Sequence, residues 1–171
     1  HFNVSFLNFE AKDSIITLGA LILGAPAAVL MSAAVTFLEF ITISDTGVYG
    51  LIMNFLACFS FSFTASLIYR RIKTMGGAIL ALGCASVVMT AVMLAANLVV
   101  TPYYMGISAA EVVKYFPKLL IPFNITKNLF NSALVLLLYK PVTTGLKKAG
   151  FLKNDGDYKL DSKTVFITIA A

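Results

Sequence analysis

The chain has 171 residues, of which 59% are hydrophobic and only 12% are charged, and its mean hydropathy is +0.89. Soluble globular domains are about half apolar and about a quarter charged, so this composition excludes that class and indicates an integral membrane protein. The net charge of +5 is modest, and the basic residues gather at the ends of apolar stretches. We therefore read them as topology signals in a lipid bilayer and expect no nucleic-acid partner.

The whole chain, residues 1–171, is expected to form one membrane domain of the all-α class, a polytopic helix bundle. An apolar helix of about 20 residues crosses a hydrocarbon core of about 30 Å. By this criterion the expected spans are, in chain order, about 14–23, 26–40, 50–69, 76–100 and 119–139.

The connections between these spans differ in character. Gly24, Ala25 and Pro26 interrupt the first apolar stretch, so residues 14–40 form either one kinked helix or two helices joined tightly. The polar stretch 41–50 is expected to be a loop. The aromatic-rich stretch 101–118 is expected to be an interfacial loop outside the helix that ends before Thr101.

The distribution of lysine and arginine predicts the orientation. Residues 70–73 hold three cationic side chains, and residues 140–153 hold four. Two expected spans separate these segments, so both lie on one side, which the positive-inside rule makes cytoplasmic. The tail 140–163 is then cytoplasmic, whereas the loops 41–49 and 101–118 and residue 1 are external.

Signatures of catalysis are absent from the sequence. It contains no GxxxxGK[ST] motif for nucleotide phosphates and no HExxH or GxSxG motif, and its one histidine is His1. Cys58 and Cys84 lie within apolar runs and are expected to be buried thiols, with neither a disulfide nor a metal site. We therefore expect no enzyme and no catalytic residues, and any powered transport must draw its energy from a partner or a gradient.

One helix face within the last span is unusually polar. Asn124, Lys127, Asn128 and Asn131 recur at helical spacing in IPFNITKNLFNS. Unpartnered amides and ammonium groups are costly in hydrocarbon, so these side chains must face the bundle interior or water. Two explanations remain open: a solute-binding face, or a lysine that snorkels to the outer interface beside asparagines that satisfy neighbouring helices. Uncharged amides with one cation, beside many aromatic residues, suit a neutral solute with a flat apolar part and a hydroxylated part.

Three stretches carry a resemblance to a known family: NFLACFSFSFTASLIYRR, AANLVVTPYYMG and LLIPFNITKNLFNSALVLLLYKPV. They resemble the riboflavin-specific substrate-binding (S) components of energy-coupling factor (ECF) transporters. The resemblance covers about residues 7–150. It implies a six-helix bundle in the plasma membrane of a bacterium, with a first helix that we expect to precede His1. Riboflavin is then the transported ligand, with no cofactor, and the partners are a transmembrane coupling subunit and two ATP-binding subunits on separate chains.

The resemblance also implies ligand contacts. Asn124 and Lys127 match the IPFN-x-x-K positions that meet the flavin, and Asn97 matches another polar contact. Tyr49, in the loop before a helix, and Glu39, at the end of the preceding helix, are expected to approach the ligand. Asn131 is expected to line the site because it shares the polar face, whereas Asn128 lies one position round the helix and is expected to pair with a neighbouring helix.

Rival functions remain open. An S component for thiamin would disfavour Lys127, because thiamin is cationic, whereas the carboxylates of biotin or folate would welcome it. A small membrane enzyme acting on lipids would need a metal cluster or paired acids. A structural membrane subunit without a solute site would not need the polar face at 124–131.

Overall fold

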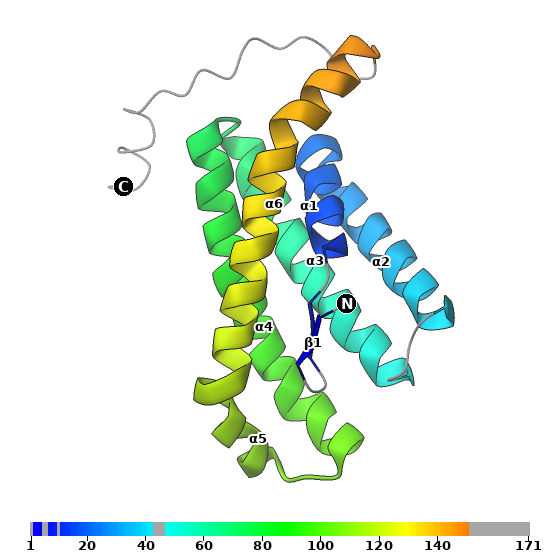
Figure 1. Ribbon diagram of the computed structural model, residues 1–171, viewed down its shortest axis with the longest axis vertical. Helices are drawn as coiled ribbons and strands as arrows, with labels where there is room; N and C mark the ends of the chain where they lie inside the picture. Colours follow the sequence, from blue (N-terminus) through cyan, green and yellow to red (C-terminus); the bar gives the residue numbers. More distant parts are fainter. Residues whose placement is uncertain (1, 5–6, 10, 43–46, 151–171) are drawn as a thin grey trace.

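The computed structural model describes residues 2–4, 7–9, 11–42 and 47–150, and the helices run alongside one another (Figure 1). In chain order the elements are β1 (Phe2–Val4), β2 (Leu7–Phe9), α1 (Lys12–Leu23), α2 (Ala25–Thr42), α3 (Gly47–Arg71), α4 (Met75–Met105), α5 (Ala109–Tyr115), η1 (Phe116–Leu120) and α6 (Ile121–Lys148). The strands form only a short antiparallel pair. The predicted all-α helix bundle is therefore confirmed.

A glycine turn separates α1 from α2, which decides between one kinked helix and two. Gly24 adopts φ 98°, a left-handed conformation that glycine tolerates best, and its N–H closes α1 by donating to the Ala20 carbonyl at 2.8 Å. Pro26 then falls in the first turn of α2, where a backbone donor is not needed. Residues 14–40 thus form two helices joined at Gly24.

Helix α3 lies at the centre of the bundle and packs against α1, α2 and α4. Its inward side chains meet mostly small residues from α4, of which Ala81 and Ala85 are fully buried. Small side chains allow helices to approach closely, which favours packing in a membrane. The core consists of Leu21, Ala57, Phe61, Ala65, Tyr69, Ala78, Ala81, Leu82, Ala85, Met89 and Val135. Cys58 is buried as expected, but Cys84 is exposed on α4, so the prediction for that thiol was wrong.

The predicted loop at 101–118 is wrong, because most of it is helical. Helix α4 continues through Pro102 and ends at Gly106, whose φ of 66° is left-handed. A proline removes only one backbone donor, and transmembrane helices tolerate this loss. Ser108 and Glu111 then form a capping box that begins α5. The π-helical turn η1 leads from α5 directly into α6.

The helices differ from the expected spans in length. Helix α6 continues past residue 139 to Lys148, so the first part of the predicted basic tail is helical, whereas residues 151–163 lie outside the described residues. Helix α1 has 12 residues and is about 18 Å long, too short to cross the bilayer alone. Among the described residues, the stretches that are long and apolar enough to cross are Ala25–Thr42, Gly47–Tyr69, Met75–Met105 and Ala109–Lys148.

Candidate functional site

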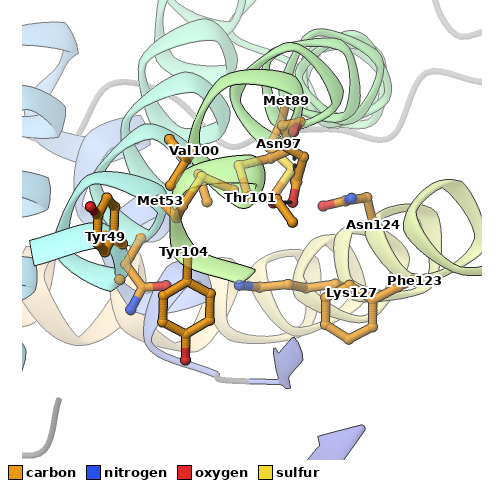
Figure 2. A pocket seen from close by; sticks show the side chains of 14 residues that line it. Tyr49, Met53, Met89, Asn97, Val100, Thr101, Tyr104, Phe123, Asn124 and Lys127 are labelled. Atoms are coloured by element: carbon orange, nitrogen blue, oxygen red, sulfur yellow. Dashed lines mark hydrogen bonds between the residues drawn. The ribbon is translucent and has the colours of Figure 1, made fainter. Parts of the chain in front are cut away.

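A cavity of about 110 Å³ lies where the beginning of α3, the end of α4 and the beginning of α6 meet. The basic residues Arg70, Arg71 and Lys73 lie at the opposite end of α3. Figure 2 shows the lining side chains converging on this cavity from the three helices. They are Tyr49, Gly50, Met53, Asn54, Ala57, Met89, Met93, Asn97, Val100, Thr101, Tyr104, Phe123, Asn124 and Lys127.

Aromatic and thioether groups form much of the cavity wall. The rings of Tyr49 and Tyr104 lie at its mouth, with centroids 5.9 Å apart and planes tilted by 58°. Methionine side chains from α3 and α4 line the wall, and Phe123 adds a third ring. Thioethers are polarizable and pack favourably against aromatic rings. This wall suits a flat, apolar and aromatic group.

The cavity wall carries uncharged polar groups, including Asn54, Thr101 and the two buried asparagines Asn97 and Asn124. The Asn97 amide nitrogen donates to the Met93 carbonyl at 2.7 Å, and its oxygen accepts from Thr101 Oγ1 at 2.8 Å. The Asn124 amide nitrogen donates to the Leu120 carbonyl at 2.8 Å. These bonds fix the orientation of both amides within their own helices. Each amide nitrogen carries two hydrogens, so a ligand oxygen can accept the second one.

Lys127 is the charged residue among those that line the cavity, and it is 6% exposed. Its Nζ lies 2.9 Å from Oδ2 of Asp13, at the beginning of α1. The second carboxylate oxygen of Asp13 accepts a hydrogen bond from Cys58 Sγ at 2.7 Å. A buried ammonium is stable only when it is paired and hydrogen-bonded, and this carboxylate supplies the pairing. The ion pair also joins α1 to α6.

Four of the six predicted site residues lie around this one cavity: Tyr49, Asn97, Asn124 and Lys127. Tyr49 occupies the first turn of α3, whereas a loop was expected. The structure does not bring the other two to the cavity wall. Asn131 is buried deeper in the bundle, where its Oδ1 accepts from Ser14 Oγ at 2.8 Å. Glu39 forms an ion pair with Lys12 between α2 and α1.

Asn128 connects α6 to α4, as its position on the helix predicted. Its amide nitrogen donates to the Ser86 carbonyl at 3.2 Å and to Thr90 Oγ1 at 3.3 Å. Its Oδ1 is buried without a hydrogen-bond partner within the described part of the chain. Polar contacts of this kind hold membrane helices together. This residue therefore belongs to the helix interface and not to the cavity.

Sequence reasoning missed Asp13, the ion-pair partner of Lys127, and did not assign Thr101 or Tyr104 to the site. The first expected span begins at residue 14, directly after Lys12 and Asp13, so neither charged residue was assigned to the site. The sequence signal that could have revealed Asp13 was the need for a carboxylate to neutralise Lys127. A lysine expected at membrane depth needs a carboxylate partner, and Asp13 and Glu39 were the acidic residues closest to the expected spans.

An apolar helix bundle with a cavity of inward-facing aromatic and amide side chains has the form of a membrane protein that binds a small solute. The sequence model of the ECF transporter substrate-specific component matches residues 1–143. The chain therefore belongs to the family of substrate-specific components of ECF transporters. It is a transport protein of the membrane and not an enzyme, and such components work in a complex with transmembrane and ATPase subunits.

A solved structure supports the same assignment. The chain is similar, with a TM-score of 0.71 and 28% identity, to a structure described as "Structure and mechanism of the S component of a bacterial ECF transporter". The similarity covers 85% of this chain and 86% of that chain. Among curated protein sequences, none matches this chain.

Proposed function

We propose that the chain captures riboflavin from the external side of a bacterial plasma membrane for ATP-driven uptake by its partner subunits. The observation that carries this proposal is the composition of the cavity. Aromatic and methionine side chains face the same space as three amides and a lysine whose charge Asp13 neutralises. Riboflavin combines a flat ring system with an uncharged chain of hydroxyl groups, so it matches both parts of the wall.

The ion pair between Lys127 and Asp13 also favours riboflavin over other vitamins. Biotin and folate carry carboxylates, and a free lysine would favour them; the Lys127 ammonium is instead held by Asp13 at 2.9 Å. Thiamin is cationic and would place its charge beside that ammonium. A neutral ligand avoids both penalties. The proposal thus favours riboflavin over these three alternatives on the ground of charge.

Titration of the purified chain with riboflavin tests the proposal. We expect saturable quenching of flavin fluorescence at one site per chain, and a yellow colour if the vitamin persists through purification. Biotin, folate and thiamin, each in large excess, should leave the flavin bound. Absence of quenching, or displacement of the flavin by one of these competitors at equal concentration, would contradict the proposal.

A further inference from the structure

The ion pair between Asp13 and Lys127 is enclosed within the bundle. The two side chains are 3% and 8% exposed, and Nζ and Oδ2 are 2.9 Å apart. Both oxygens of the carboxylate are engaged, because Oδ1 accepts from Cys58 at 2.7 Å. The Asp13 backbone is fixed as well, since its carbonyl accepts from Thr17 Oγ1 at 2.6 Å. The Asp13 carboxylate is therefore held by side chains of two other helices, Lys127 on α6 and Cys58 on α3.

This pair sets the charge of the cavity. Of the described residues that line the cavity, Lys127 is the one with a formal charge, and Asp13 neutralises it. At hydrogen-bond distance the two charges act on a ligand as a dipole, whose field falls off faster than that of a single charge. The neighbouring cation Lys12 is likewise paired, with Glu39. The charge of Lys127 in the described cavity wall is therefore offset by Asp13, whereas Glu111, Lys114 and Lys118 lie exposed on α5 and η1, outside the wall.

We propose that Asp13 is a specificity-determining residue that makes the site select neutral flavins over phosphorylated ones. The inference rests on the proposed function and adds a role for a residue on α1 that lies outside the cavity wall. A phosphate brings a charge of about −1.5 to −2 at neutral pH. In a cavity whose own charges cancel, that anion has no available counterion, and burial of an unpaired charge is strongly unfavourable. The uncharged ribityl chain meets no such barrier.

A series of charge variants tests this role. The measured quantity is the ratio of the dissociation constants of riboflavin 5′-phosphate and riboflavin, from fluorescence quenching of the full chain in detergent. Asp13→Asn removes the carboxylate that neutralises Lys127 and makes the site more positive by one charge, so the ratio should fall by at least about tenfold. Lys127→Gln leaves the carboxylate alone, so the ratio should rise by at least about tenfold. The double variant is neutral again, and its ratio should stay within about threefold of the parent, although both ligands bind more weakly.

The ratio separates this role from a structural one. A residue that only stabilises the fold would weaken both ligands equally and leave the ratio unchanged. A ratio that stays within about twofold in a folded single variant therefore overturns the inference. If neither single variant folds, the double variant decides, because a tenfold change in its ratio would trace selectivity to individual contacts and not to charge balance. Failure of the parent to bind riboflavin would instead refute the proposed function.

Discussion

Asn124 and Asn128 are the same residue type one turn apart on α6, yet they have different neighbours. Asn124 lines the cavity and bonds only within its own helix, through the Leu120 carbonyl. Asn128 reaches α4 and bonds to Ser86 and Thr90. The rotation of about 40° between positions i and i+4 is enough to separate a cavity residue from an interface residue. The pair therefore offers a matched comparison.

We predict that Asn124→Ala weakens riboflavin binding roughly 5- to 150-fold. Loss of one partner of a buried hydrogen bond costs about 1–3 kcal/mol, which corresponds to this range. Asn128→Ala is the control, and it should lower the thermal melting temperature while leaving affinity within about twofold of the parent, because it removes only interhelical bonds. Fluorescence titration and a melting curve on each variant give both values. Equal affinity losses in the two variants would contradict the assignment of Asn124 to the site.

The shared polar face of α6 could be predicted from the sequence. Which of its residues line the cavity and which contact neighbouring helices could not. Helical spacing predicted one shared face for Asn124, Lys127, Asn128 and Asn131, directed to the bundle interior or to water, and the structure shows the interior, with each at most 6% exposed. Which of them meets a cavity depends on where the neighbouring helices end, and that depends on contacts distant in sequence. Asn131 shows this dependence, because its partner Ser14 lies 117 residues away. Spacing along one helix carries no information about such a partner.

At the level of elements, the tight turn into α4 depends on a glycine. The side chain of Thr74 caps the helix by accepting from the Gly77 N–H at 3.0 Å. This cap brings the preceding Ile72 carbonyl against Gly77, where an added Cβ would lie 2.0 Å from the oxygen. Gly83, further along the same helix, has nothing within 4 Å of an added Cβ. Both glycines thus lie in the same helix, but only Gly83 has room for a side chain.

We predict that Gly77→Ala destabilises the folded chain by about 1–3 kcal/mol, because the turn must open to relieve the clash. Gly83→Ala should be neutral or slightly stabilising, since alanine favours the helix by up to about 1 kcal/mol over glycine. The melting temperature of the purified protein, with and without riboflavin, measures both effects. Similar stability in the two variants would show that the turn adapts and that this close approach is unimportant.

The boundaries of the helices were predicted less well from the sequence than the helices themselves. The sequence left open whether residues 14–40 form one kinked helix or two helices. The turn at Gly24, which has a positive φ, shows that they form two. The helix within 101–118 could have been predicted from the sequence, because Ser108 and Glu111 have the spacing of a capping box. The π-helical turn at Phe116–Leu120 had no such signal. Its geometry follows from how α5 must join α6, which is a property of the assembled bundle.

On the scale of the whole molecule, substrate capture and energy supply are separate. The sequence contains no P-loop motif, and the family works with transmembrane and ATPase subunits. We predict that the purified chain, reconstituted alone in vesicles, binds riboflavin but does not accumulate it, with or without ATP. Co-reconstitution with the coupling and ATP-binding subunits should confer ATP-dependent accumulation. Concentrative uptake by the single chain in ATP-free vesicles would contradict this division of labour.

The cavity and two basic segments, 70–73 and 140–148, lie at opposite ends of the bundle, whereas Lys114 and Lys118 lie near Glu111 at the cavity end. The exposed cations Arg70 and Arg71 lie in the last turn of α3 and Lys73 follows it, whereas the cavity lies at the beginning of that helix. In Figure 1 the far end of α6, which carries Lys147 and Lys148, extends away from the end where α5 lies. If the positive-inside rule orients this chain, the basic end is cytoplasmic and the cavity faces outward.

Cysteine accessibility in intact cells tests this orientation. The background variant carries Cys58→Ser, which keeps a hydrogen-bond donor to Asp13, and Cys84→Ala. A cysteine at Arg71 should resist a membrane-impermeant thiol reagent, because that end of α3 is expected to be cytoplasmic. A cysteine at Tyr103, which is 76% exposed near the cavity end of α4, should react. Both cysteines should react after the cells are permeabilised, which controls for local burial. Labelling at Arg71 but not at Tyr103 in intact cells would show that the cavity faces the cytoplasm. A site open to that side could not capture a vitamin from the medium.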